Sequence, residues 1–301
     1  MPTSDKSSAF RSGFVAIAGA PNAGKSTLLN RILGEKISIT SQKPQTTRNR
    51  ILGIAHRPGS QMVFIDTPGV HQARGELNTR IVNVALTSLG DVDLILLVTD
   101  LAAPDPASEN LLVKALVGQK RPVILALNKT DLVKKNTILP AMEAWSGRCP
   151  FQEIIPVSAR QGDGVESLLA AMENTLPEGP PFFPEESLTD MPYRFLAAEV
   201  IREKAFRLTG QEIPYSVAVT IDSFKENTKR NLTKINATIH VERDSQKGII
   251  IGKKGVKLKQ IGENARKDIE QMLASRVYLK LFVRVQKNWS QDTRALRRFG
   301  Y

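Results

Sequence analysis

Two glycines, a lysine and a serine within residues 19–26 have the types and spacing of a phosphate-binding loop. Gly19 and Gly24 allow a tight turn whose backbone N–H groups point at phosphate oxygens, and Lys25 could reach the β- and γ-phosphates of a nucleotide. The Ser26 hydroxyl could ligate Mg²⁺. We expect the nucleotide to be contacted by every residue from the first glycine into the next helix: Gly19, Ala20, Pro21, Asn22, Ala23, Gly24, Lys25, Ser26 and Thr27.

A second set of residues, Asp66-Thr67-Pro68-Gly69, directly follows the apolar run 62–65. An aspartate at a strand end can hold Mg²⁺ through its water shell, and the Gly69 N–H can approach the γ-phosphate. Because that contact needs the third phosphate, the segment after it can switch between two states. All four residues are expected at the nucleotide, with Asp66 at the metal.

The polar stretch 36–50 is a second candidate switch. A threonine there could ligate Mg²⁺ only while the γ-phosphate is bound. Thr46 and Thr47 both fit by position, and we favour Thr47 as the metal ligand and as a catalytic residue. A basic, exposed loop without this role is the alternative.

A third set of residues would read the base. Asn128, Lys129 and Asp131 follow the apolar run 123–127. The Asp131 carboxylate could accept hydrogen bonds from the ring N–H and the exocyclic amine of guanine. Adenine lacks this donor pair, and a site built on buried hydrogen bonds rejects such a molecule by ~10⁴ or more. Asn128 would brace the base and the phosphate loop, and the Lys129 stem would cover the ring. A backbone N–H after the run 154–157 could also bond the guanine carbonyl oxygen, at Ser158 or Ala159.

The elements that must position these residues alternate along residues 12–178. We expect strands at 14–18, 51–56, 62–65, 94–98, 123–127 and 154–157. We expect helices near 27–33, 77–89, 108–117, 137–146 and 164–175. Short strands joined by helical crossovers predict an α/β fold, with a mostly parallel sheet and helices on both faces. Ligands bind at the carboxyl ends of such strands, which is where the motifs fall.

The net charge of +12 lies entirely in the last third of the chain. Residues 1–190 hold 19 basic and 19 acidic residues, whereas residues 191–301 hold 23 and 11. A surface of that sign attracts polyanions, although a basic face kept only for solubility is the alternative. Five prolines between Pro177 and Pro192 predict a fairly stiff interdomain linker.

Residues 193–301 predict a small α+β domain. A helix at 193–208 precedes alternating strands at 217–221, 235–241 and 277–285, and a helix at 258–273 lies before the last strand. The loop between residues 252 and 255 has the Gly-x-x-Gly pattern of KH domains, which clamps the backbone of ~4 single-stranded nucleotides. Bases would lie in an apolar groove between a helix and a strand. The expected RNA contacts are Ile251, Gly252, Lys253, Lys254, Gly255 and Lys257.

The chain end leaves two interpretations open. Trp289 and the cluster of Arg294, Arg297 and Arg298 could extend the RNA surface. They could equally be a packed aromatic residue and a solvated tail.

Over almost the whole chain these motifs resemble the Era family of bacterial GTPases, with the nucleotide motifs at 19–26, 45–49, 66–69, 128–131 and 158–160. The resemblance implies GTP and GDP binding with Mg²⁺, and GTP hydrolysis. It divides the chain into a flexible tail (1–11), a P-loop GTPase domain (12–178), a Pro-rich linker (179–192) and a type II KH domain with a basic C-terminal tail (193–301). It also implies binding to the single-stranded 3′ end of 16S rRNA in the small ribosomal subunit, a role in subunit assembly and rRNA maturation, and peripheral association with the inner membrane.

The residue after Gly69 bears on the mechanism. Many signalling GTPases place a water-orienting glutamine there, but this chain has Val70. Asn22 is the residue type that related potassium-activated GTPases use to help hold K⁺ beside the phosphates. A K⁺ ion there would act as an arginine finger does, and turnover would be slow and faster in K⁺ than in Na⁺. The expected catalytic residues are Asn22, Lys25, Thr47 and Gly69.

Composition narrows the class of protein. One cysteine, Cys149, excludes disulfides and a cysteine zinc site and fits a cytoplasmic protein. The three histidines are scattered without metal-ligand spacing, and no apolar run approaches membrane-spanning length. We expect a monomeric enzyme. Two other classes stay open: a membrane-associated switch whose basic domain docks on anionic lipid, and a non-catalytic RNA-binding protein that uses GTP as a structural ligand.

Overall fold

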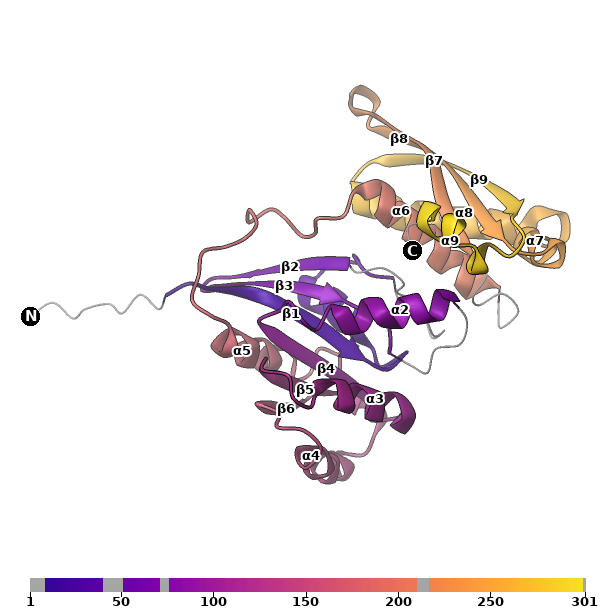
Figure 1. Cartoon of the computed structure of the whole chain (residues 1–301). Helices are drawn as coiled ribbons and strands as arrows, with labels where there is room; N and C mark the ends of the chain where they lie inside the picture. The colour runs from indigo at the N-terminus through magenta and orange to yellow at the C-terminus, as the bar shows by residue number, and fades with distance from the viewer. Residues whose placement is uncertain (1–8, 40–50, 71–75, 210–216, 300–301) are drawn as a thin grey trace, which may run out of the picture. The chain divides into compact units, whose positions relative to one another are not determined.

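The computed structural model describes residues 9–39, 51–70, 76–209 and 217–299 (Figure 1). Its contacts divide the chain into two compact units. Of the described residues, unit 1 holds 9–35, 51–70 and 82–190, and unit 2 holds 36–39, 76–81, 191–209 and 217–299. Residues 179–190 therefore group with the first unit, although the sequence places them in a linker.

Unit 1 contains a six-stranded sheet of order β2-β3-β1-β4-β5-β6. Its strands are β1 (Arg11–Gly19), β2 (Ile51–Arg57), β3 (Ser60–Asp66), β4 (Leu94–Asp100), β5 (Val123–Asn128) and β6 (Glu153–Pro156). Only the β2–β3 pair is antiparallel. The predicted mostly parallel sheet is therefore confirmed, and β1 begins within the range assigned to the N-terminal tail.

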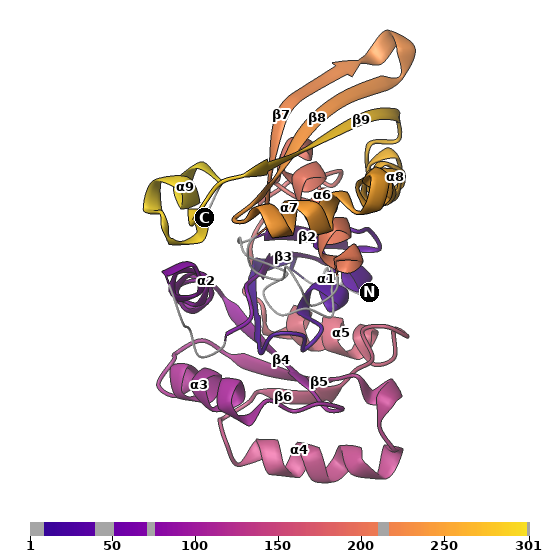
Figure 2. The same ribbon diagram turned by 90° about the vertical axis from the view of Figure 1, so that its right-hand side faces the viewer.

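Helices cover both faces of this sheet, as predicted (Figure 2). One apolar core includes side chains of α1 (Lys25–Leu33) and α5 (Val165–Thr175). The core on the other face includes side chains of α2 (Glu76–Thr87), α3 (Pro106–Leu116) and α4 (Ile138–Ser146). The strands are apolar on both faces because each face is buried. This burial holds the carboxyl strand ends in fixed positions.

The proline-rich segment is bonded to the β2–β3 side of unit 1. We call residues 179–189 the strap. Gln61, a buried side chain of β3, accepts hydrogen bonds from the N–H groups of Phe182 (2.6 Å) and Phe183 (3.0 Å) and donates to the Phe183 carbonyl (2.7 Å). The Ile54 N–H of β2 donates to the Leu188 carbonyl (2.9 Å). The strap is thus anchored, because a side chain inside the sheet satisfies its backbone groups.

Unit 2 has a three-stranded sheet of order β7-β8-β9, with β7 and β8 antiparallel and β8 and β9 parallel. The elements are α6 (Tyr193–Leu208), β7 (Ala218–Asn227), β8 (Leu232–Val241), α7 (Asp244–Ile251), α8 (Val256–Leu273), β9 (Arg276–Val285) and α9 (Thr293–Arg298). Their order is helix, two strands, two helices and a strand, which fits the predicted type II KH arrangement. Side chains of α6, α7 and α8 share one apolar core with the sheet.

Three features of unit 2 differ from the expectations. β7 runs to Asn227, since pairing with β8 resumes after a bulge between Ile221 and Ser223. α7 has definite bounds that the sequence pattern did not give. α9 is a short helix where a tail was expected. Among the described residues, no helix is both long and apolar enough to cross a bilayer.

Candidate functional site

The predicted phosphate loop is a turn between β1 and α1. Its backbone enters the left-handed region at Asn22 (φ 62°) and Gly24 (φ 96°). Asparagine is one of the few non-glycine residues that adopt this region readily. Gly24 has a second constraint, since a Cβ there would lie 2.2 Å from the side-chain nitrogen of Asn128. The loop and the predicted base-reading segment are therefore in direct contact.

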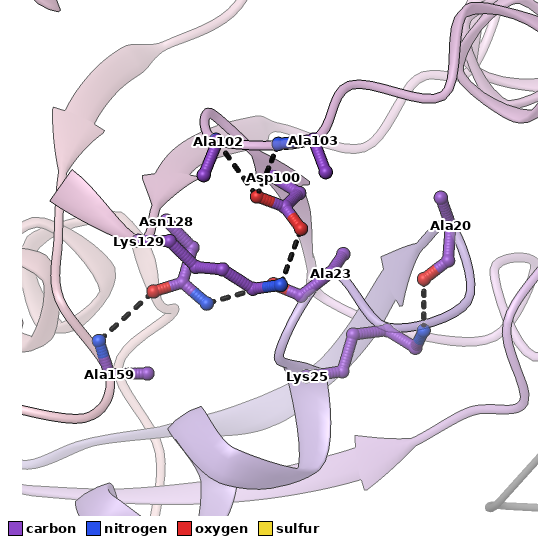
Figure 3. A network of polar contacts seen from close by, with 9 residues as sticks. All are labelled: Ala20, Ala23, Lys25, Asp100, Ala102, Ala103, Asn128, Lys129 and Ala159. Carbon is purple, nitrogen blue, oxygen red and sulfur yellow. Dashed lines mark hydrogen bonds and ion pairs between the residues drawn. The ribbon is translucent and has the colours of Figure 1, made fainter. Parts of the chain in front are cut away.

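Lys25 is buried beneath the loop. Its ammonium group donates hydrogen bonds to the carbonyl oxygens of Gly19 (3.1 Å) and Ala20 (2.8 Å; Figure 3). Burial lowers the pKa of Lys25 to about 8, and the charge of Asp66 opposes this shift. Near neutral pH the side chain is therefore mostly a cation, bonded directly to two neutral carbonyl groups. An anionic phosphate group would add a second opposite charge to that of Asp66.

Two side chains whose oxygen atoms could ligate a metal lie next to each other beside the loop. The Ser26 hydroxyl donates a 2.7 Å hydrogen bond to the carboxylate of Asp66, which is fully buried at the end of β3. A hydroxyl and a carboxylate are the hard oxygen ligands that Mg²⁺ takes along with phosphate oxygens. This pair therefore fits the metal expected from the sequence. The third expected ligand, Thr47, lies outside the described residues.

The segment after Asp66 is fixed against β1 and the phosphate loop. The Thr67 hydroxyl donates to the Ile17 carbonyl (2.7 Å), and the Val70 N–H donates to the Gly19 carbonyl (3.1 Å). A Cβ on Gly69 would lie 2.7 Å from the Pro21 nitrogen. Gly69 thus lies against the loop, as expected of a γ-phosphate contact. The Thr67 hydroxyl, in contrast, is already bonded to a carbonyl group of β1. Pro68 lies between Thr67 and Gly69.

Asn128 joins two segments of the site (Figure 3). Its side-chain nitrogen donates to the carbonyl of Ala23 in the phosphate loop (2.8 Å), and its side-chain oxygen accepts from the N–H of Ala159 (3.0 Å). The side chain is buried at the end of β5. One carboxamide therefore couples the phosphate loop to the loop after β6, which agrees with the predicted bracing of the phosphate loop.

Lys129 is held by an aspartate that the sequence analysis missed. Its ammonium group bonds the carboxylate of Asp100, and the same carboxylate accepts from the N–H groups of Ala102 (2.9 Å) and Ala103 (3.0 Å). Lys129 adopts φ 67°, and the ion pair holds its stem in place. Asp100 ends β4, so its position at a carboxyl strand end was the signal that could have found it.

Asp131, the expected guanine reader, accepts a 2.7 Å hydrogen bond from the hydroxyl of Ser158. That bond orients one carboxylate oxygen. The expected N–H donors for the guanine carbonyl have acceptors within the protein: Ser158 N–H donates to the Asp163 carbonyl (2.9 Å), and Ala159 N–H donates to Asn128. A guanine carbonyl would have to share one of these bonds.

In unit 2 the Gly-x-x-Gly loop connects α7 to α8. Gly252 (φ 70°, ψ 175°), Lys254 (φ 51°) and Gly255 (φ 79°) have positive φ. A Cβ on Gly252 would lie 2.7 Å from that of Lys257, so this glycine is needed for space as well as for backbone angle. The side chains of Lys253 and Lys254 are exposed. The loop therefore offers two cations on a backbone that a ligand can approach closely, with Ile251 and Lys257 on either side.

A cavity of about 450 Å³ lies between α8 and β9. Leu258, Leu279 and Leu281 contribute its apolar surface, and the loop's Gly255 lies at one end. The remaining lining residues are mostly polar or charged: Lys259, Gly262, Glu263, Arg266 and Lys280. A groove between a helix and a strand is therefore present, and that it holds the bases stays a prediction.

The structure answers the open question of the chain end for Trp289, whereas an RNA contact by the arginine cluster stays a prediction. Trp289 is fully buried, with its ring 5.1 Å from that of Phe299 in an edge-to-face arrangement, and it shares a small core with Ala218. It is a packed aromatic residue, so its ring cannot extend an RNA surface. The three arginines of α9 are exposed: Arg294, Arg297 and Arg298. In the described part of the chain no group of three or more His, Cys, Asp or Glu side chains is arranged to hold a metal ion.

Comparisons with known proteins agree with this division. A family model described as a 50S ribosome-binding GTPase matches residues 14–129, and a model described as a KH domain matches residues 212–290. GTPase Era of Geobacter metallireducens is 56% identical over 292 residues, which cover 97% of this chain and 98% of that protein. GTPase Era of Syntrophus aciditrophicus is 51% identical over 97% of this chain and 95% of that protein.

Two solved structures match the described fold. Each is 41% identical and covers 97% of this chain and 99% of the other. One is a single-residue variant of Aquifex aeolicus Era bound to GDP and AlF4⁻, with a TM-score of 0.92. The second is Era in complex with MgGDPNP and nucleotides 1506–1542 of 16S ribosomal RNA, with a TM-score of 0.93.

Proposed function

The chain belongs to the Era family of GTPases, and from this premise we propose that it uses the state of its bound nucleotide to control its grip on single-stranded RNA near the 3′ end of 16S rRNA. The similarity extends over both units, so the proposal covers the nucleotide site and the KH loop together. The proposed role is in assembly of the small ribosomal subunit and maturation of its rRNA. The protein would act as a monomer in the cytoplasm.

For the nucleotide half, each segment has a distinct proposed task. The phosphate loop and Lys25 bind the phosphates, and Asp131 reads guanine with Lys129 covering the ring. Ser26 and Asp66 would hold Mg²⁺, together with Thr47; the metal would neutralise phosphate charge. The observation that carries this assignment is the Asn128 side chain, which bonds Ala23 and the Ala159 N–H at once. That bond pair supports a single site formed by the phosphate-binding and base-reading segments.

For hydrolysis, Val70 offers no polar group to orient water, and it is buried. We propose that Asn22 helps to hold a K⁺ ion at the phosphates, where a cation would stabilise the charge of the transition state. The Asn22 side chain is exposed on the loop. This assignment predicts that GTP turnover depends on K⁺.

Peripheral association with the inner membrane stays a prediction that flotation with anionic vesicles would test.

For the RNA half, the Gly252–Gly255 loop and the α8–β9 groove are the proposed contacts. A KH loop binds the RNA backbone, and its neighbouring groove binds the bases. The solved Era complex contains RNA and a GTP analogue together, which supports a coupling between the two sites.

The test compares Gly252→Asp with Gly248→Asp in the full-length protein. Position 248 lies in α7, is exposed, and has no atom within 4 Å of an added Cβ, so it is a matched control for the added charge. Multiple-turnover GTP hydrolysis is measured with and without the RNA of nucleotides 1506–1542. We expect Gly252→Asp to lose RNA binding and any effect of RNA on turnover while keeping GTP affinity. Gly248→Asp should retain all three.

Two results would contradict the proposal. Wild-type protein that binds GTP but never turns it over would point to GTP as a structural ligand. Equal RNA affinity of Gly252→Asp and wild type would remove the KH loop from the proposed function.

A further inference from the structure

The sheet of unit 2 has an outer face that α6, α7 and α8 do not cover. Along β9, Val277 is buried and Leu279 and Leu281 pack on the core. The residues between them point the other way: Tyr278 is 59% exposed and Phe282 is 45% exposed. Successive side chains of a strand alternate between faces, so the two rings lie on the same, outer face.

Basic side chains surround these two rings. Lys280 lies between them on β9, with its ammonium group 5.1 Å from the centre of the Phe282 ring. By strand register, Lys234 of β8 is the neighbour of Tyr278. Arg276 and Arg284 occupy the ends of the same row on β9 and are exposed. We call these six residues the outer-face patch: Lys234, Arg276, Tyr278, Lys280, Phe282 and Arg284.

The rest of the outer face is covered by other side chains or is polar, and it includes one carboxylate, that of Asp222. Residues Trp289, Leu296 and Phe299 pack over Ala218, and the His240 ring lies 4.6 Å from that of Phe299. The carboxylate of Asp222 on β7 accepts hydrogen bonds from the hydroxyls of Thr220 (3.4 Å) and Thr238 (2.7 Å). The exposed aromatic area of this face is therefore confined to the β9 side, where the charges are positive.

The patch is continuous with the groove already described. β9 is an edge strand of the sheet (Figure 2), and Lys280 both lines the α8–β9 cavity and belongs to the patch. A strand leaving the groove past Lys280 would reach the outer face without crossing another element. The two rings are four residues apart, or ~13 Å along the strand, whereas nucleotides in one strand of a duplex are ~3.4 Å apart along the axis. They would hold non-adjacent bases of an extended strand.

We propose that the outer-face patch is a second binding surface for single-stranded RNA, which stacks bases on Tyr278 and Phe282 while Lys234 and Lys280 contact phosphates. Aromatic platforms within a basic surface are how proteins bind single strands with little sequence preference. The inference rests on the proposed function, because it extends the RNA path beyond the KH groove.

Two other occupants fit less well. Insertion into an anionic membrane favours a group of aliphatic and aromatic side chains, but the neighbours of these rings are lysine, asparagine and threonine. A second copy of the chain would bring one basic patch against another, which costs free energy. RNA matches both the rings and the charge.

The experiment compares two RNA probes on the full-length protein by fluorescence anisotropy. The long probe is the RNA of nucleotides 1506–1542, and the short probe is its last ~5 nucleotides, enough for the ~4 that a KH groove holds. The variant Tyr278→Ser/Phe282→Ser is expected to bind the long probe at least about tenfold more weakly and the short probe as wild type does. Tyr278→Phe should behave as wild type, because stacking needs the ring and not the hydroxyl. Tyr193→Ser removes a similarly exposed tyrosine (53%) from α6 and is the control.

Two further measurements test the phosphate contact of Lys280 and the position of the RNA on the patch. Lys280→Gln should lower the slope of log affinity against log salt by ~0.7 for the long probe. With 4-thiouridine in the long probe, photo-crosslinks should appear on a peptide that contains residues 276–285.

Each contrary outcome has a distinct meaning. Unchanged affinity of the double-serine variant for the long probe would overturn the inference. Equal loss of both probes would also overturn it, since the residues would then act through the KH loop or the fold. Loss of flotation with anionic vesicles, with RNA affinity intact, would assign the patch to membranes instead. Failure of the proposed function is distinguishable, because Gly252→Asp would then bind both probes as wild type does.

Discussion

At the scale of single residues, the nucleotide site depends on side chains that bond the protein itself. Asn128 bonds two loops, Ser158 orients Asp131, and Asp100 holds Lys129. These bonds restrict the conformations of the reading groups, which lowers the entropy cost of binding a nucleotide.

Asn128→Asp tests this arrangement with almost no change in shape. The substitution removes the donor to Ala23 and turns a carboxylate toward that carbonyl oxygen. Loss of such a buried bond costs about 2–3 kcal/mol, so GDP affinity, measured with a fluorescent analogue, should fall by roughly 30- to 150-fold. Asn136→Asp makes the same change at an exposed site and should bind normally. Unchanged affinity of Asn128→Asp would mean that the bridge does not organise the site.

Asn22→Gly tests the proposed potassium site. Glycine accepts φ 62° without strain, so the variant loses only the carboxamide. We expect wild-type turnover to be faster in K⁺ than in Na⁺, and the variant to have the slow rate in both salts. Phosphate release at matched ionic strength is the measurement. Equal wild-type rates in the two salts would rule out the site.

At the scale of elements, the α7–loop–α8 segment places two glycines in different surroundings. Gly252 has both a backbone angle that glycine alone adopts and a close neighbour in Lys257, whereas a Cβ on Gly255 would meet no atom within 4 Å. The clamp is therefore rigid on its α7 side and more tolerant on its α8 side. The end of the unit 2 sheet that α9 covers is a second element, and its stability can be measured.

The two glycines should respond differently to alanine. Gly255→Ala has only the left-handed backbone penalty, about 1 kcal/mol. Gly252→Ala adds a contact at 2.7 Å and a backbone region that is essentially confined to glycine, for a total of about 2–3 kcal/mol. Urea unfolding, followed by Trp289 fluorescence in a Trp145→Phe background, measures both free energies. Equal losses would show that neither the close neighbour nor the backbone region of Gly252 adds a cost.

His240 should make unit 2 sensitive to acid. Burial and the charges of Arg298 and Arg284, opposed by Asp222, lower its pKa to about 4. The unfolded chain therefore takes up the proton first, and stability is lost as the pH falls from about 6.5 toward 4, by about 1.4 kcal/mol per unit. Trp289 fluorescence should report a loss of about 2 kcal/mol between pH 6.5 and 5. In the His240→Gln variant the free energy of unfolding should change less across that window than in wild type. Parallel curves of this free energy against pH for the two proteins would refute the assignment.

At the scale of the whole molecule, function is divided between two units with different charge. The neutral part of the sequence carries the nucleotide motifs, and the part with 23 basic and 11 acidic residues carries the RNA elements. The strap is the covalent route between them, and Gln61 bonds it to the sheet at three backbone groups. A segment held in this way has fewer conformations than a free linker of the same length.

Gln61→Ala should release the strap. The variant leaves three backbone groups of Phe182 and Phe183 without their partner, so limited proteolysis should cut within 179–189 faster than in wild type. Gln119→Ala, at an exposed position, is the control. We also expect GTP affinity to stay unchanged while the difference in RNA affinity between the GTP-analogue and GDP states becomes smaller. Resistance to cleavage equal to wild type would show that the remaining strap contacts suffice.

The sequence by itself determined the fold class, the nucleotide motifs and the KH loop, because these depend on local rules. Alternating apolar runs predict strands, and glycine spacing predicts the two loops wherever the chain folds around them. Asp66 and Asn128 lie at strand ends, and Ser26 lies at the start of the helix after β1, because parallel strands bring these positions to one edge of the sheet. Local pattern is sufficient for such features.

Only the tertiary structure decided which groups are bonded and which are exposed. Asp100 and Gln61 have roles that depend on partners far away in the sequence. The strand-end position of Asp100 marks it as a candidate site residue, but no local pattern identifies the partner of either residue. Trp289 lies buried in a core and Tyr278 lies exposed on the surface, although both are aromatic residues in a basic region of the sequence. The side of a strand that is buried depends on what packs against it, and that is a property of the folded chain.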